Sequence, residues 1–401
     1  MPIAVYVLGL SIFALGTTEF MISGLLPQIA TDLGVSIPDA GLLVSGFALG
    51  MLVGAPVMAV LTLRLPRKVT LLAALGVFAA GQALGAVAPS YGALMAARVL
   101  TAVATGAFWA VGGVVATRLV PPERRGRALA VMVGGLTVAN VVGVPLGTVV
   151  GEALGWRAGF WAVGALAALG FAGVAVFVPR VSGAEARPDL RAEVRAFASA
   201  RIWAALATTA VVAAAIFGVF SYVAPLATGV TGLAPGLVPV VLMVFGVGGV
   251  LGVVVGGRVA DAYPFRTLYW GLAGLAVVLA LLGVAVRVPW AVLVLAGAFG
   301  VAGFVINPVL NGRVIGLAGD APTLAASSSV SAFNTGNMLG PWLGGLVIEG
   351  FGTSAVPWLG AGLAALTVGV VGVSAVLERR HVREQAAAGA VDAGVAERAR
   401  A

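Results

Sequence analysis

The chain has 401 residues, of which 61% are hydrophobic and 9% are charged. A soluble globular domain carries about 25% charged residues, so this composition excludes a soluble fold. Because there is no cysteine, a disulfide framework, an iron–sulfur cluster and a thiolate zinc site are excluded. The single histidine, His381, leaves no metal cluster and no nucleophile–histidine pair in the body of the chain. We therefore expect no enzyme activity, no bound metal and no cofactor.

Twelve mostly apolar runs follow one another along the chain, and each has the roughly 20 residues that a helix needs to cross the hydrocarbon core of a bilayer. The first run has no basic segment before it and no cleavage site after it, so we expect it to be retained as a helix. The sequence thus predicts an all-α membrane protein with 12 transmembrane helices. The runs are 4–28, 38–62, 69–88, 92–117, 128–150, 157–178, 202–226, 236–258, 267–287, 289–311, 323–347 and 355–377.

Two polar segments divide these runs. They predict an N-terminal six-helix bundle over 1–179, a cytoplasmic linker over 180–201, a C-terminal six-helix bundle over 202–378 and a cytoplasmic tail over 379–401. With a cytoplasmic N-terminus, all but three of the 23 Lys and Arg residues fall on the cytoplasmic side or its helix ends. This asymmetry predicts a multi-pass protein of the plasma membrane with both termini in the cytoplasm. The net charge of +8 is then a topology signal, and no nucleic-acid partner is expected.

The two halves of the chain repeat each other at a nearly constant offset. A parallel repeat of six spans is typical of transporters, in which two bundles move around a site at the midplane of the membrane. Channels, membrane enzymes and structural anchors do not need this architecture. The matching pairs include Phe47 and Phe245, Gly54 and Gly252, Asn140 and Asn337, Gly143 and Gly340, and Glu152 and Glu349.

Several segments resemble the major facilitator superfamily. Its loop motif after the second span is similar to Leu63-Arg64-Leu65-Pro66-Arg67-Lys68, and again to Gly257-Arg258-Val259-Ala260-Asp261 in the second half. The fifth run, with Asn140-Val141-Val142-Gly143-Val144-Pro145-Leu146-Gly147, resembles the motif of the proton-antiporter branch. Gly16-Thr17-Thr18-Glu19-Phe20 and Thr105-Gly106-Ala107-Phe108-Trp109-Ala110 are most similar to actinobacterial chloramphenicol exporters. The resemblance implies gating roles for Gly54, Arg64, Arg67, Lys68, Gly143, Pro145, Gly147, Asp261, Gly340 and Pro341.

Glu19 is the one acidic residue of the sequence that falls deep inside a predicted span. A charge at the centre of a membrane helix costs about 2.5–3.5 kcal/mol, so such a residue is expected to face a cavity and to have a function. Burial favours the protonated form of a carboxyl group, and we expect Glu19 to load a proton outside and to release it inside. The alternative is a neutral Glu19 that hydrogen-bonds a neighbouring helix for packing only.

Arg98, in the fourth run, is the one cation inside a predicted span. It resembles the arginine of the superfamily motif in that span, which implies a role in proton coupling. Because arginine stays protonated, Arg98 would act on Glu19 rather than carry the proton. The alternatives are that Arg98 reaches the outer interface or caps helix carbonyl groups.

Candidate residues for a substrate cavity are apolar rings and a few polar side chains of the first, fourth, fifth, seventh, tenth and eleventh runs. Asn140, Asn307 and Asn337 are better candidates than the rings, because an amide inside a membrane needs a partner. The candidates are Phe13, Glu19, Phe20, Ser23, Trp109, Asn140, Phe217, Phe220, Tyr222, Asn307, Asn334 and Asn337.

The leading functional prediction is proton-coupled export of amphipathic antibiotics, phenicols above all, by a monomer whose partners are drug, protons and lipid. Export of a sugar or nucleoside is the first alternative, although a sugar site usually needs more polar side chains. Passive facilitated diffusion is the second, and a sensory protein with a degenerate transporter fold is the third.

Overall fold

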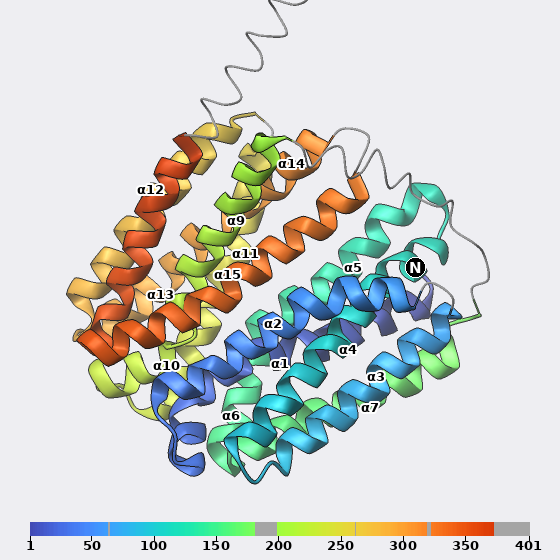
Figure 1. The fold of residues 1–401 in the computed structure, drawn as a ribbon, viewed down its shortest axis with the longest axis horizontal. Coiled ribbons are helices and arrows are strands. Elements are labelled where there is room, and N and C mark those ends of the chain that lie inside the picture. Colours follow the sequence, from blue (N-terminus) through green and yellow to red (C-terminus); the bar gives the residue numbers. More distant parts are fainter. Residues whose placement is uncertain (63–64, 181–198, 261, 319–321, 373–401) are drawn as a thin grey trace, which may run out of the picture.

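The computed structural model describes the chain except for residues 63–64, 181–198, 261, 319–321 and 373–401, and the described part is helical throughout (Figure 1). The predicted linker and tail therefore lie largely or wholly outside the described residues. The first half contains α1 (Ile3–Leu33), α2 (Ile37–Leu61), α3 (Arg67–Ala86), α4 (Tyr91–Arg118), α5 (Arg125–Val138), the turn η2 (Ala139–Gly143), α6 (Val144–Leu154) and α7 (Trp156–Phe177). The second half contains α9 (Ala200–Phe220), α10 (Val223–Pro225), η3 (Leu226–Val230), α11 (Val238–Val259), α12 (Pro264–Ala285), α13 (Pro289–Phe304), α14 (Asn307–Ala318), α15 (Pro322–Phe351) and a last helix over Thr353–Gly372.

Eleven helical segments of the described chain are long and apolar enough to cross a membrane, and they coincide with eleven of the twelve predicted runs. The remaining run, 323–347, is the 30-residue helix α15. Its hydropathy is lower because it carries Asn334, Thr335 and Asn337 within its length. Contact with lipid alone would therefore not stabilise α15 inside a membrane, and its polar side chains need hydrogen-bond partners from the surrounding protein.

The sequence predicts one continuous helix for the fifth run, but the structure divides it into three helical segments. Helix α5 passes through the π-helical turn η2 before it continues as α6. Pro145 lies just after the turn, and a proline removes one backbone donor and pushes against the carbonyl group four residues before it. The wider π turn relieves that conflict, so Asn140 and Gly143 lie on a local irregularity of the helix.

Helices α1 to α7 pack into one bundle, and α9 to α15 with the last helix pack into a second (Figure 1). The same glycine contacts recur in both bundles. A Cβ atom added at Gly54 of α2 would lie 2.9 Å from the Cα atom of Val103 on α4, and one added at Gly252 of α11 would lie 3.1 Å from the Cα atom of Val301 on α13. These glycines were predicted to be repeat equivalents, and they let equivalent pairs of helices approach closely.

The two bundles meet mainly along α2 and α15, which run side by side between them (Figure 1). We call the half of the molecule in which α1 ends and α2 begins the distal half. Here Ser45 Oγ of α2 donates a hydrogen bond of 2.7 Å to the carbonyl oxygen of Met338 on α15. One turn further out, Gly41 and Gly344 leave room for the ring of Tyr222. The distal half is therefore sealed by contacts between the bundles.

Candidate functional site

Glu19 lies midway along α1, where the two bundles meet, and its side chain is only 8% exposed. Helix α1 is central to its bundle, because α2, α4, α5, α6 and α7 all contact it. Across the interface, Asn337 Nδ2 of α15 donates a hydrogen bond of 3.4 Å to Glu19 Oε1. Among the residues whose burial is described, Glu19 is the only buried acid.

Arg98 is fully buried on α4 and holds the backbone of α1 at the same level. Its Nη1 atom donates to the carbonyl oxygen of Thr18 at 2.8 Å, and its Nη2 atom donates to that of Glu19 at 3.2 Å. The guanidinium group lies 4.3 Å from the centroid of the Phe47 ring. Within the described chain, Arg98 therefore binds carbonyl groups of α1 and not the carboxylate of Glu19, which is the capping arrangement given above as an alternative.

Gln82 of α3 extends this polar network beneath α1. Its Nε2 atom donates to Thr18 Oγ1 at 2.8 Å, and the same hydroxyl oxygen accepts from Arg98 Nη1 at 3.3 Å. Both Gln82 and Thr18 are fully buried. Sequence reasoning missed them, although a glutamine inside the third predicted run was a usable signal because a buried amide needs a partner.

An aromatic cluster fills the interface beside Glu19. The Phe20 ring of α1 stacks on the Phe217 ring of α9, with centroids 5.0 Å apart and an interplanar angle of 9°. The Phe217 ring meets the edge of Phe333 on α15 at 5.3 Å, and Phe220 continues the cluster toward Phe245 of α11 at 4.6 Å. Phe20, Phe217 and Phe220 were predicted candidates, whereas Phe333 and Phe245 were not. The contact between Phe20 and Phe217 joins the two bundles.

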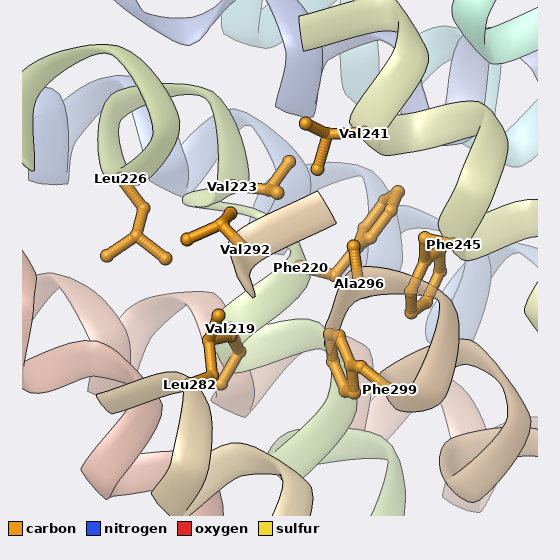
Figure 2. Close-up of a pocket in the computed structure, with 10 residues that line it drawn as sticks. All are labelled: Val219, Phe220, Val223, Leu226, Val241, Phe245, Leu282, Val292, Ala296 and Phe299. Atoms are coloured by element: carbon orange, nitrogen blue, oxygen red, sulfur yellow. The ribbon is translucent and has the colours of Figure 1, made fainter. Parts of the chain in front are cut away.

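A small apolar pocket opens behind this cluster, inside the second bundle (Figure 2). Phe220 and Phe245 belong to both the cluster and the pocket wall. None of the lining residues carries a charge, so the pocket suits an apolar group only. Its lining is Val219, Phe220, Val223, Leu226, Val241, Phe245, Leu282, Val292, Ala296 and Phe299.

The polar candidates separate into two groups. Asn337 reaches Glu19, and Ser23 lies one turn further along α1 with its buried Oγ atom unpaired in the described structure. Asn334 donates to the carbonyl oxygen of Val330 in its own helix, although its Oδ1 atom has no partner among the described residues. The other two amides have different surroundings. Asn140 lies in η2 with its backbone carbonyl against Gly246, and the carbonyl oxygen of Asn307 accepts a hydrogen bond from Asn311.

Two candidate rings lie outside the aromatic cluster. Trp109 packs against Phe47, Met51 and Ala102, and Phe13 lies beside Gly143.

The glycines with predicted gating roles lie at helix crossings. A Cβ atom added at Gly147 would meet the side chain of Met21 on α1, and one added at Gly340 would lie 2.6 Å from the carbonyl oxygen of Ala214 on α9. A Cβ atom added at Gly143 would meet the side chain of Thr17 on α1. Pro145 is the second residue of α6, and the carbonyl oxygen of Pro341 accepts a hydrogen bond from Tyr222.

The predicted gating residues of the loop after α2 are only partly described. Lys68 Nζ donates to the carbonyl oxygen of Ala175 at 2.6 Å, close to the C-terminal end of α7, where a cation is favoured by the helix dipole. Arg67 also has an interaction partner. Arg64 and Asp261 lie outside the described residues.

Tyr222 is fully buried in the distal half, and its Oη atom donates to the carbonyl oxygen of Pro341 at 2.7 Å. The hydroxyl group therefore ties the end of α9 to α15. We expect Tyr222→Phe to lower the thermal unfolding midpoint of the purified protein, because a net hydrogen bond contributes about 0.5–1.5 kcal/mol. Tyr6→Phe, at an exposed tyrosine of α1, is the control and should leave the midpoint unchanged. Equal midpoints for both variants would contradict this role.

Comparisons with known proteins agree on one family. The sequence profile described as "Major Facilitator Superfamily" matches residues 8–321. The inner membrane transport protein YdhP of Escherichia coli K12 is 38% identical over 92% of this chain and 95% of its own length. A chloramphenicol resistance protein of Streptomyces lividans is 41% identical over 85% of this chain and 88% of its own length.

A solved structure shares the fold. It is a bacterial homologue of the human lysosomal transporter Spinster, crystallised in an inward-facing and unoccupied conformation. The TM-score is 0.75 with 18% sequence identity, over 93% of this chain and 95% of that one. At this identity the likeness concerns the arrangement of the helices alone.

Proposed function

Because this chain belongs to the major facilitator superfamily, we propose that it exports amphipathic antibiotics, phenicols such as chloramphenicol above all, in exchange for protons. The family profile and the relative YdhP each match most of the chain, so the proposal starts from a membrane-embedded transporter. The substrate class is supported by the similarity to the chloramphenicol resistance protein of Streptomyces lividans. The proton is supported by Glu19, a buried acid at the interface of the two bundles.

The aromatic cluster supports a substrate with an aromatic ring. Phe20 and Phe217 stack across the interface, and stacked rings contribute about 0.5–1.5 kcal/mol beyond the area they bury. A nitrophenyl group that slides between them would replace one ring partner by another. Polar groups of the same molecule would then lie near Ser23 Oγ and Asn337 Oδ1, which are buried and unpaired in the described structure. A phenicol, with one ring and several polar groups, fits this chemistry.

Glu19 supports antiport because drug and proton would use the same place. An ionised carboxylate buried at the interface can be neutralised by a proton or released from its contacts by a bound drug. Arg98 is anchored to the carbonyl groups of Thr18 and Glu19, so it keeps this stretch of α1 in position. We propose that the distal half faces the outside of the plasma membrane and that both termini lie in the cytoplasm, as the distribution of Lys and Arg favours. We propose a monomer as the working unit.

The test is accumulation of labelled chloramphenicol in cells that express the protein, with and without an uncoupler. We expect low accumulation with the wild-type protein, and high accumulation after uncoupling or in Glu19→Gln. The matched control is Glu349→Gln, at an exposed acid near the distal end of α15, which should export like the wild type.

Other outcomes would point to the alternatives. Faster equilibration of the drug across the membrane than in non-expressing cells, with no uphill export and no effect of the uncoupler or of Glu19→Gln, would indicate a passive facilitator of the same fold. No difference in accumulation between expressing and non-expressing cells would reject phenicols, and a labelled sugar or nucleoside would then be tested in the same assay.

A further inference from the structure

Among the described residues, the contact with Asn337 is the only hydrogen bond to the side chain of Glu19, and it crosses from one bundle to the other. The distance of 3.4 Å between Asn337 Nδ2 and Glu19 Oε1 is long, because such bonds centre near 2.9–3.0 Å. Asn337 is fully buried, and its Oδ1 atom has no partner among the described residues. One half of this buried amide is therefore weakly bonded and the other half is unused.

The protonation state of Glu19 decides what this amide can do. A carboxylate only accepts hydrogen bonds, so it can use Nδ2 of Asn337 but turns its remaining lone pairs toward an amide oxygen that repels them. A protonated carboxyl group also donates, and it can give its O–H to Oδ1 while its carbonyl oxygen accepts from Nδ2. Binding of one proton to the carboxylate thus changes one long hydrogen bond into a closed pair of bonds. A buried polar group left unpaired is unfavourable, so the paired form is the more stable one.

We propose that Asn337 is a positioning residue that senses the protonation of Glu19 and thereby links proton binding to closure of the distal half. This inference rests on the proposed exchange of drug for protons. Glu19 belongs to the first bundle and Asn337 to the second, so the bond between them crosses the interface. Ser45 binds Met338, the residue next to Asn337, so the Asn337 bond and the distal seal are neighbours on α15.

The direction fits the needs of an antiporter. After the drug leaves on the distal side, the protein must close again only when it carries a proton. The closed pair of bonds with Asn337 favours the distal-closed conformation for protonated, drug-free Glu19. The ionised, drug-free form lacks this support. A drug that offers its own polar groups to Asn337 would take the place of the proton, so one amide would couple the two ligands.

The charges around Glu19 do not provide the same link. Glu19 and Arg98 are the only buried acidic and basic side chains among the residues whose burial is described. Arg98 is the charged group that faces Glu19 from the surrounding helices, and it lies on α4 of the same bundle. The buried phenol of Tyr222 donates to Pro341 instead. Of these groups, only Asn337 belongs to the second bundle and also contacts the carboxyl group of Glu19. Asn337 is therefore the group that can transmit the protonation state of Glu19 to the second bundle.

The test separates two transport modes in proteoliposomes that contain the full chain. Net movement of labelled chloramphenicol driven by a pH gradient requires the protonated, drug-free return step, whereas exchange of labelled for unlabelled chloramphenicol does not. Because Asn337 also faces the drug, we expect Asn337→Ala to raise the drug concentration at which exchange is half-maximal. At saturating drug, however, we expect gradient-driven transport to fall roughly ten-fold more than exchange, as the loss of a hydrogen bond in the return step implies. Asn311→Ala, at an exposed asparagine of α14, is the control and should keep both modes.

Retained exchange also shows that the variant is folded. If Asn337→Ala gives no exchange, Asn337→Ser takes its place, because serine is too short to form the pair of bonds but fills more of the space. Equal losses of both modes in the serine variant, or gradient-driven transport at the wild-type rate in either variant, would overturn the role of Asn337. Failure of the proposed function is distinguishable, since the wild-type protein itself would then show no gradient-driven transport.

Discussion

Arg98→Lys is expected to lower gradient-driven drug transport roughly ten-fold or more, even though it keeps the positive charge. The guanidinium group reaches the carbonyl oxygens of both Thr18 and Glu19 and lies over the Phe47 ring. A lysine carries a point charge on a flexible stem and cannot repeat this forked geometry. Hydrogen bonds to charged groups contribute about 1.5–3 kcal/mol each, so the loss of one reduces a conformational equilibrium roughly ten-fold or more.

The measurement is transport by purified protein in proteoliposomes, with the thermal unfolding midpoint recorded in parallel. Arg287→Lys, at an exposed arginine beyond α12, is the matched control and should leave both values unchanged. If charge alone mattered, Arg98→Lys would transport like the wild-type protein, and the anchoring of α1 by Arg98 would have to be abandoned.

Gly340→Val is expected to cause a large loss of stability. A Cβ atom at Gly340 would lie 2.6 Å from the carbonyl oxygen of Ala214 and 2.7 Å from the backbone nitrogen of Gly218, both on α9. Backbone atoms cannot turn aside as a side chain can, so α9 and α15 would have to move apart. Overpacking of a close interior costs about 1–3 kcal/mol, and a contact with backbone belongs at the upper end of that range.

The same helix supplies the control. A Cβ atom added at Gly350 would meet nothing within 4 Å, so Gly350→Val should unfold at nearly the wild-type temperature. We expect Gly340→Val to unfold at a clearly lower temperature and to lose transport, because α15 carries Asn337 and the contacts with α2. Similar unfolding temperatures for both variants would show that the close approach of α9 and α15 is not needed.

The sequence by itself determined the helices and their approximate ends. Apolar runs long enough to cross a bilayer have no other stable form, because each backbone polar group must be bonded within its own segment. The sequence also showed the repeat of the two halves. Gly54 and Gly252 recur at equivalent positions because the helices cross so closely there that a larger side chain would not fit. The importance of Glu19 also followed from the sequence, because a charge inside an apolar run is costly wherever the other helices lie.

Only the tertiary structure decided which side chains meet across the bundles. Asn334 and Asn337 are both candidates in the sequence, yet Asn334 bonds its own helix and Asn337 reaches Glu19. Arg98 could have bonded the carboxylate or the backbone, and the packing of α4 against α1 selects the backbone. Such contacts depend on the rotation and spacing of helices far apart in the chain. Local hydropathy fixes that a helix forms, but it carries no information on which residue of another helix lies opposite.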